Sequence, residues 1–316
     1  MPAILQHTDN EIIRVKPFLK WAGGKGQLLK LFHNLYPLEL KENRVKNYYE
    51  PFLGSGAVFI DIVQKFRIEH AYLSDINEEL VLTWLVIQKD IHKLIEALLS
   101  IEKKYDRLDK EKRKAYYYQQ RDDFNTKRFA FNDNKYADSW IKRAAQIIFL
   151  NRTCFNGLFR VNSKGAFNTP AGEYANPTIC DEQNLLAIAK LLDKATIQKK
   201  DFNAALKNVK PSSFIYFDPP YRPISKTALF TAYSKFFFAD QEQNQLGKLF
   251  EQLDKKGAKM MLSNSDPKNI DPKDDFFDDL YKGFNIIRVP AKRLINSKVS
   301  ERGSINEIIV TNYTVG

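Results

Sequence analysis

The sequence Phe214-Ile215-Tyr216-Phe217-Asp218-Pro219-Pro220-Tyr221 joins a short apolar run to an acid, two prolines and an aromatic residue. Its first four residues are β-prone and uninterrupted by polar side chains, which predicts a strand buried on both faces of a parallel sheet. The prolines cannot extend such a strand, so it should end at Asp218. Because open α/β sheets bind ligands beyond the carboxyl ends of their strands, we expect an α/β protein with a ligand site at Asp218.

The turn after this strand is chemically suited to an amino group. An ionised Asp218 only accepts hydrogen bonds, and Pro219 and Pro220 supply carbonyl acceptors without backbone N–H donors. Tyr221 can stack on the face of a ring. These residues therefore fit a pocket for a flat, amino-bearing ring, although a proline-stopped strand with a helix-capping Asp is a plainer structural alternative.

A glycine turn lies upstream, in Glu50-Pro51-Phe52-Leu53-Gly54-Ser55-Gly56, between an expected strand and an expected helix. Such turns bring backbone amides close to a ligand. The third glycine of a dinucleotide fingerprint is missing, because Val58 and Phe59 follow, so a pyrophosphate cofactor is disfavoured. About 20 residues after the turn, a second apolar run ends at Asp75, which is the spacing of an acid that binds ribose hydroxyls. The two features predict a nucleoside cofactor, with an ordinary βαβ unit as the alternative.

A further glycine loop, Lys20-Trp21-Ala22-Gly23-Gly24-Lys25, combines two cations with an indole. It differs from a phosphate-binding P-loop, which needs a Ser or Thr after its lysine, because Gly26 follows Lys25. The loop therefore offers no hydroxyl to a magnesium ion. A flexible loop with one buried tryptophan is the alternative to a binding role.

The composition favours a polyanionic partner. The 316 residues carry 49 Lys and Arg against 38 Asp and Glu, a net charge of +11, and phosphate contacts by such a surface release counterions. Cys154 and Cys180 form no C-x-x-C pair, which argues against a zinc site and a disulfide framework and favours a reduced, cytoplasmic protein. No apolar run reaches the length of a membrane span, and residues 1–14 lack the apolar region of a signal peptide.

The segment between Asp75 and Asp218 is far longer than a crossover within one sheet, so we expect an inserted domain. We place this domain at residues 86–195, between catalytic segments at 1–85 and 196–316. Apolar spacing predicts helices over about 81–125, 137–150 and 181–193, with a loop or small hairpin at 151–177. Strands are expected at 196–202, 259–263 and 305–311, and the first of them should end at Asp201-Phe202, where an adenine ring can rest.

In chain order, the segments Lys20–Lys25, Glu50–Gly56, Ser74–Asn77 and Asp218–Tyr221 resemble the Dam-like (D12 class) DNA adenine-N6 methyltransferases. The cofactor motifs precede the long insert and the Asp-Pro-Pro-Tyr motif follows it, which is similar to the alpha arrangement of amino-methyltransferases. Residues 151–162 with 165–172 resemble the DNA-reading segment of this family, and residues 293–313 resemble its final hairpin.

The resemblance implies a Rossmann-like mixed α/β sheet with helices on both faces, plus an inserted, mainly helical DNA-recognition domain. It implies a site-specific enzyme that methylates N6 of a flipped adenine in double-stranded DNA, within GATC, using S-adenosylmethionine and no metal. The residues expected to be catalytic are Asp218, Pro219, Pro220 and Tyr221. The residues expected to bind the cofactor are Trp21, Lys25, Gly54, Gly56, Asp75, Asp201, Phe202 and Asp218.

Residues Phe155 to Arg160 have the chemistry of a reader of double-stranded DNA. Arg160 can bind guanine O6 and N7 together, Asn156 can pair with a base edge, and Phe155 or Leu158 can wedge into the base stack. The resemblance implies that Lys20 and Arg160 contact guanines. Phe155 replaces the family's more usual Tyr, which should keep the stacking but remove one phosphate bond. The alternative is that these residues form a turn under a helical cap.

The expected chemistry assigns Asp218 and the Pro219 carbonyl to the two hydrogens of adenine N6, so that the nitrogen lone pair points at the methyl group. We expect a monomer, and the sequence leaves open whether a restriction endonuclease accompanies it. Three alternatives remain: an amino-methyltransferase acting on cytosine N4 or RNA, one acting on protein glutamine, and a DNA-binding protein without catalysis. The glutamine enzymes have Asn in place of the Asp at position 218, so they are disfavoured.

Overall fold

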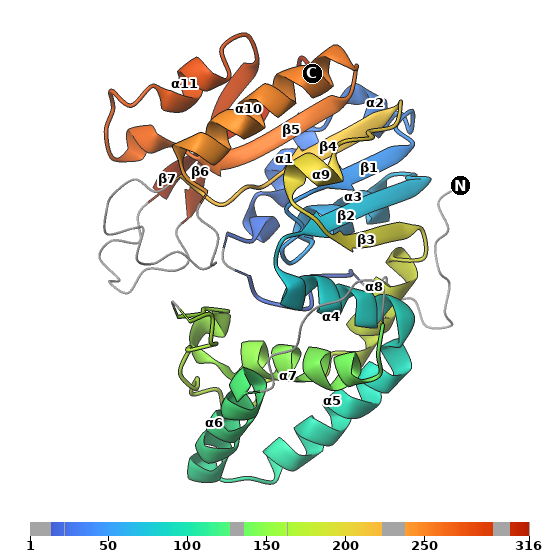
Figure 1. The fold of residues 1–316 in the computed structure, drawn as a ribbon, viewed down its shortest axis with the longest axis vertical. Helices are drawn as coiled ribbons and strands as arrows, with labels where there is room; N and C mark the ends of the chain where they lie inside the picture. Colours follow the sequence, from blue (N-terminus) through green and yellow to red (C-terminus); the bar gives the residue numbers. More distant parts are fainter. Residues whose placement is uncertain are drawn as a thin grey trace.

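The computed structural model describes residues 14–21, 23–126, 136–162, 164–222, 238–292 and 304–315. In these residues the strands form a seven-stranded sheet with the order β3-β2-β1-β4-β5-β7-β6 (Figure 1). Strand β7 pairs antiparallel with β5 and β6, whereas the other neighbouring strands are parallel. The strands are β1 (Asn47–Glu50), β2 (His70–Asp75), β3 (Ala195–Lys199), β4 (Ser213–Phe217), β5 (Lys259–Ser265), β6 (Asn285–Lys292) and β7 (Ser304–Thr311).

The strand order reverses beside β1. The chain runs outward from β1 through β2 to β3 and later returns to place β4 on the other side of β1. In a parallel sheet, the crevice outside the carboxyl ends of the two strands at such a reversal binds ligands. Here those ends are Glu50 of β1 and Phe217 of β4, which directly precede the glycine turn and Asp218.

Alternate residues of the strands enter two hydrophobic cores, because successive side chains of a strand point to opposite faces of the sheet. Phe214 and Tyr216 belong to the larger core, whereas Ile215 and Phe217 belong to the smaller one. The expected strand buried on both faces is therefore confirmed.

Helices cover both faces of the sheet, as expected for this mixed α/β fold (Figure 1). The helices that contribute to the larger core are α1 (Leu29–Leu35), α2 (Leu38–Lys41), α3 (Ala57–Lys65), α4 (Glu78–Lys89), α5 (Ile91–Asp106), α6 (Lys110–Thr126), α7 (Ser139–Thr153) and α8 (Glu182–Leu191). Those that contribute to the smaller core are α9 (Phe202–Ala205), α10 (Asp240–Lys255) and α11 (Phe276–Leu280).

Helices α5, α6 and α7 lie beyond one edge of the sheet, in the lower part of Figure 1. A partly buried ion pair joins α7 to α4, because the Nε of Arg143 on α7 donates to Glu79 at 3.1 Å. The Nη1 of Arg143 also donates to the Phe124 carbonyl of α6 at 2.5 Å. The larger core runs from the sheet into these helices without a break. The division into 1–85, 86–195 and 196–316 stays a prediction, and its first boundary lies within α4.

The structure differs from the sequence-based predictions at three places. Strand β3 ends at Lys199, and Asp201 starts α9 instead, because its Oδ1 accepts hydrogen bonds from the amides of Asn203 and Ala204. Helix α7 continues to Thr153, past the expected loop start at 151. Strand β6 was not expected, and the part of the final hairpin at 293–303 lies outside the described residues.

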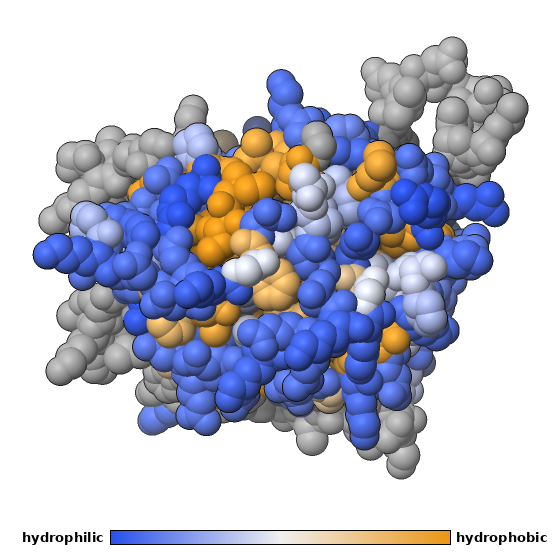
Figure 2. All heavy atoms as spheres, turned by 90° about the horizontal axis from the view of Figure 1, so that it is seen from above, coloured by the Kyte–Doolittle hydropathy of each residue, from blue (hydrophilic) through white to orange (hydrophobic). Residues whose placement is uncertain are grey.

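The surface seen from above in Figure 2 is mostly hydrophilic, with hydrophobic residues gathered near its centre. Exposed apolar atoms are normal on a protein surface, so this face carries no functional assignment. Within the described ranges, no helix combines the length and the apolar character needed to cross a membrane.

Candidate active site

The glycine turn after β1 is fixed from two sides. The Gly54 amide donates to Asp75 Oδ2 at 2.9 Å, and Nε1 of Trp84 on α4 donates to the Gly54 carbonyl at 3.1 Å. Gly56 has a φ of +67°, and a Cβ at this position would lie 2.6 Å from the Trp84 ring. Only glycine therefore fits at position 56. Sequence reasoning missed Trp84, because its contact with the turn arises only when α4 packs against β2 and β3.

Asp75, the expected ribose acid, lies at the end of β2 and supports the turn itself. Its Oδ1 accepts from the Asn77 amide at 2.8 Å while Oδ2 accepts from Gly54. Burial raises the pKa of Asp75, and these amide hydrogen bonds oppose the rise. A carboxylate offers about four acceptor positions, so the two amides leave capacity for hydroxyl donors.

Lys25 and Asp218 form a buried ion pair. Lys25 is only 3% exposed, and its Nζ lies 2.5 Å from Asp218 Oδ1 and 2.8 Å from the Gly23 carbonyl. The same Asp218 oxygen accepts from Ser263 Oγ at 3.2 Å. Burial alone would lower the pKa of Lys25, but its interactions with Asp218, Tyr221 and Glu307 together outweigh burial and raise the pKa. Burial raises the pKa of Asp218, and the ammonium of Lys25 opposes that rise.

The Asp-Pro-Pro-Tyr turn (Asp218–Tyr221) keeps part of its acceptor surface free. Among the described residues, none donates a hydrogen bond to Asp218 Oδ2 or to the Pro219 carbonyl. The Tyr221 ring lies with its centre 5.0 Å from Lys25 Nζ and is partly exposed. The structure thus brings together Lys25, Asp218 and Tyr221. From the sequence, Lys25 is expected to bind the cofactor, Tyr221 to be catalytic and Asp218 to do both.

Two further acids approach this ion pair, and sequence reasoning gave neither of them a role. Glu307 on β7 lies opposite Ser265, is 6% exposed, and its Oε2 has no hydrogen-bond partner in the described structure. Burial raises its pKa, and Lys25 opposes the rise. Glu50, at the end of β1, is 2% exposed and accepts from the Tyr48 hydroxyl at 2.6 Å. The sequence did contain a signal for Glu50 and Glu307, because each is a charged residue within a mainly apolar strand.

The expected DNA-reading residues lie on a small hairpin after α7, which we call the reading loop (Phe155–Arg160). Bridges between Cys154 and Ala171 and between Val161 and Phe167 close the hairpin. Phe155 is 53% exposed. Asn156 and Arg160 are also exposed, and Leu158 is partly buried. One guanidinium nitrogen of Arg160, Nε, donates to Asn168 at 2.9 Å.

Asn151 joins the reading loop to Lys20. Its Oδ1 accepts from the Lys20 amide, and its Nδ2 donates to the carbonyls of Lys20 and Gly157, each at 2.9 Å. Asn151 is 1% exposed, whereas the Lys20 residue is exposed. The adjacent Trp21 stacks on Phe159 with ring centres 5.3 Å apart. Lys20 and the reading loop are thus neighbours, although they are far apart in sequence.

Asp201 and Phe202 make their contacts with residues other than Lys25 and Asp218. Asp201 is exposed and caps α9, while Phe202 is 7% exposed and stacks on Phe52 with ring centres 5.6 Å apart. Phe52 follows β1, so this stack lies at the edge of the sheet that carries the glycine turn. In the residues that the structure covers, no group of three or more His, Cys, Asp or Glu side chains is arranged to hold a metal ion.

The sequence pattern of the family described as D12 class N6 adenine-specific DNA methyltransferase matches residues 21–295. The chain belongs to this family. Relatives include the type II methyltransferase M.MjaIII of Methanocaldococcus jannaschii, which is 49% identical over 95% of this chain and 100% of its own length. The type II methyltransferase M1.LlaDCHI of Lactococcus lactis is 37% identical over 95% of this chain and 96% of its own. The DNA adenine methylase of Haemophilus influenzae is 30% identical over 94% and 93%, respectively.

Membership in this family makes the protein an adenine-specific DNA methyltransferase, as the resemblance implied. The motif order described above therefore belongs to an enzyme, and the alternative of a DNA-binding protein without catalysis is set aside. The expected roles of individual residues stay predictions, since the family match concerns the chain as a whole.

Gly56→Ala should destabilise the methyltransferase by more than backbone strain alone. A left-handed φ costs a non-glycine residue about 1–2 kcal/mol, and the added Cβ also overlaps the Trp84 ring. Gly257→Ala is the matched control, because Gly257 has a φ of +78° and open space around it. Urea unfolding of both variants measures the difference. Equal losses in free energy of unfolding would show that the contact with Trp84 does not restrict this position.

Proposed function

We propose that this methyltransferase transfers the methyl group of S-adenosylmethionine to N6 of a flipped adenine at the Asp-Pro-Pro-Tyr turn. The observation that carries the proposal is the division of acceptors in this turn. Lys25 and Ser263 bind Asp218 Oδ1, while Oδ2 and the Pro219 carbonyl accept nothing from the described residues. Two acceptors are what the two hydrogens of an adenine amino group require.

The residues at the glycine turn fit the proposed cofactor. Gly54 and Gly56 keep the turn clear of side chains, Asp75 retains acceptor capacity for ribose hydroxyls, and Glu50 lies buried at the adjacent strand end. Trp21 contributes the side chain nearest to a Cβ built on Gly54. We assign Trp21, Lys25, Gly54, Gly56, Asp75, Asp201, Phe202 and Asp218 to cofactor binding, as predicted. When bound, S-adenosylmethionine supplies a methyl group on a sulfonium, which leaves as a neutral thioether.

The protein's part in the reaction is to position N6 and to manage its proton. The lone pair of adenine N6 is shared with the ring, and hydrogen bonds from its two hydrogens to Asp218 Oδ2 and the Pro219 carbonyl favour a pyramidal nitrogen. Lys25 keeps Asp218 ionised, so that it accepts. Tyr221 offers a face on which the adenine can stack. Forming the N6–methyl bond obliges the nitrogen to lose one proton, and we assign that proton to Asp218.

We propose that double-stranded DNA binds along the reading loop and Lys20. Phe155, Asn156 and Arg160 are exposed there, and the net charge of +11 favours a phosphate backbone. Because N6 of a paired adenine lies within the duplex, the base must flip to reach Asp218, at a cost of a few kcal/mol. The combination of Lys20, Phe155, Asn156, Leu158 and Arg160 supports GATC as the target.

The setting of the enzyme is part of the proposal. Two relatives are named type II methyltransferases, which supports pairing with a restriction endonuclease in the same cell. The enzyme would approach one adenine at a time, from one side of the DNA, and such an asymmetric approach requires only a monomer. We propose that it acts on DNA in the cytoplasm of a bacterial or phage-infected cell, with residues 86–195 as the target-recognition domain.

Asp218→Ala should lower the rate of methyl transfer by about 10²–10⁴-fold while duplex binding persists, because the substitution removes the N6 acceptor and leaves the reading loop intact. Asp279→Ala, an exposed acid on α11, is the control and should keep the full rate. Labelled methyl incorporation measures the rate, and nucleoside analysis of the product DNA should show N6-methyladenine. An Asp218→Ala enzyme with near-normal rate, or N4-methylcytosine in the product, would falsify the proposal.

Lys25→Gln should move the acid limb of the pH profile of kcat/KM to higher pH. Burial already raises the pKa of Asp218, and loss of the Lys25 cation removes the charge that opposes this rise. Asp218 would then be protonated, and unable to accept, at a pH where the wild-type carboxylate is still ionised. Lys25→Arg keeps the charge and should leave the limb near its wild-type position. Coinciding limbs for Lys25→Gln and wild type would contradict this role for Lys25.

DNA from a host without other adenine methylation should become modified at GATC when it expresses this protein. The reason is the guanine-binding chemistry of Arg160 and Lys20 beside Asn156, and single-molecule sequencing detects the modified adenines. Modification found only at other sequences would overturn the target while leaving the chemistry at Asp218 unaffected.

A further inference from the structure

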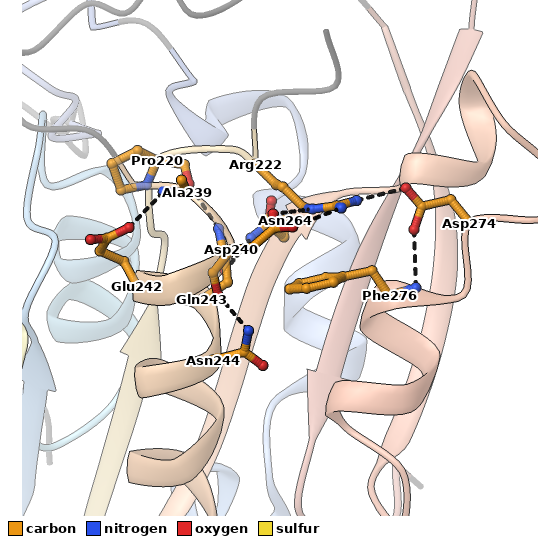
Figure 3. Close-up of polar contacts among 10 residues, drawn as sticks. All are labelled: Pro220, Arg222, Ala239, Asp240, Glu242, Gln243, Asn244, Asn264, Asp274 and Phe276. Atoms are coloured by element: carbon orange, nitrogen blue, oxygen red, sulfur yellow. Dashed lines mark hydrogen bonds and ion pairs between the residues drawn. The ribbon is translucent and has the colours of Figure 1, made fainter. Parts of the chain in front are cut away.

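Behind the Asp-Pro-Pro-Tyr turn, two buried side-chain amides form a chain of hydrogen bonds (Figure 3). Gln243 on α10 donates through Nε2 to the Pro220 carbonyl at 3.2 Å. Asn264 on β5 donates through Nδ2 to Gln243 Oε1 at 3.3 Å. Both side chains are 0% exposed. This chain ends at Pro220, which lies between Pro219 and Tyr221, two residues that we assign to adenine binding.

Each amide in the chain has its orientation set by its neighbour. The Ser265 amide donates to Asn264 Oδ1 at 2.8 Å, so Nδ2 of Asn264 must face Gln243. Gln243 therefore turns its oxygen toward Asn264 and its nitrogen toward Pro220. Flipping either amide would bring two donors or two acceptors together. The network consequently has one arrangement, and it begins at the backbone of β5.

Helix α10 holds the exit of the same turn at a second point. Arg222, two residues after Pro220, donates through Nε to Asp240 and through Nη1 to Asp274, each at 2.6 Å. Its guanidinium carbon also lies 4.1 Å from the centre of the Phe276 ring (Figure 3). Asp240 and Gln243 both belong to the first turn of α10. The position of this helix therefore determines where the chain leaves the turn, at Arg222.

The hydrogen bond from Gln243 decides which proline carbonyl is available. The Pro220 carbonyl already accepts a hydrogen bond from Gln243. The Pro219 carbonyl has no donor among the described residues. Rotation of the peptide after Pro220 would break the bond to Gln243 and would also move Tyr221. The hydrogen bond from Gln243 therefore restrains both the position of the Pro219 carbonyl and the orientation of the Tyr221 ring.

We propose that Gln243, oriented by Asn264, is a positioning residue that fixes the Asp-Pro-Pro-Tyr turn so that Asp218 and the Pro219 carbonyl together receive the N6 hydrogens. The inference rests on the proposed role of that turn in methyl transfer. A small displacement of groups that hold a reactant lowers the rate steeply, by as much as about 10²-fold for 1 Å. A network that served only to satisfy buried polar groups would affect stability and leave the rate of the folded enzyme unchanged.

The test compares Gln243→Met, which removes the donor at similar volume, with Gln245→Met on the exposed side of the same helix. Gln243→Glu is a second variant that keeps an acceptor for Asn264 and loses the donor to Pro220. Each variant is assayed well below its melting temperature for its single-turnover methylation rate and for its dissociation constants with S-adenosylmethionine and duplex DNA. The variant Asn264→Leu and the double variant Asn264→Leu/Gln243→Met show whether Asn264 affects the methylation rate only through Gln243.

We expect both Gln243 variants to methylate about 10- to 100-fold more slowly, with nearly unchanged dissociation constants, and Gln245→Met to match wild type. Asn264→Leu should also slow the reaction, and the double variant should be no slower than Gln243→Met alone. Wild-type rates in the folded Gln243 variants, or losses that follow the unfolded fraction, would overturn the inference. If Asp218→Ala is inactive in that case, only the role of Gln243 fails. If Asp218→Ala is active, the proposed function itself fails.

Discussion

Burying the ammonium of Lys25 is costly unless an anion accompanies it, and Asp218 is that anion. The pair joins residues that lie 193 positions apart, so it forms only when the glycine loop before α1 closes over the end of β4. This closure also sets the chemistry of the site. One carboxylate oxygen is occupied by the cation and by Ser263, whereas the other oxygen receives no hydrogen bond from the described residues.

The same edge of the sheet carries an acid on four strands. Glu50, Asp75 and Asp218 end or follow the parallel strands β1, β2 and β4, while Glu307 lies on antiparallel β7, opposite Ser265 near the end of β5. Burial raises the pKa of all four carboxylates. Glu50, Asp75 and Asp218 accept hydrogen bonds from a hydroxyl, from backbone amides and from Lys25, respectively. A site with this excess of acceptors suits cationic and amino-bearing ligands. It would repel a pyrophosphate, in agreement with the missing third glycine of the turn.

Local patterns predicted the parts of the site whose geometry is set by neighbouring residues. The strand before Asp218, the glycine turn and Asp75 each follow from periodicity, proline chemistry or spacing. The prediction placed Asp201 at the end of a strand, but its side chain accepts a hydrogen bond from the Asn203 amide and caps a helix instead. The prediction missed β6 because this strand contains Pro290, which a strand at the edge of a sheet tolerates. Trp84, Gln243 and Glu307 could not be found in this way, since their roles depend on contacts between segments that only the folded chain brings together.

Two consecutive residues, Lys20 and Trp21, connect the predicted DNA-reading residues with the predicted cofactor site. The Lys20 backbone is held by Asn151 at the end of α7, and Asn151 also holds the Gly157 carbonyl of the reading loop. The next residue, Trp21, stacks on Phe159 of that loop, and its indole is the nearest neighbour of a Cβ built on Gly54. Because Lys20 and Trp21 are adjacent in the chain, neither can shift without moving the other. The reading loop and the glycine turn are therefore positioned by the same short segment. These contacts thereby place the reading loop relative to the sheet edge that carries Asp218, so that, in the proposed function, reading a base and presenting its amino group are parts of one geometry.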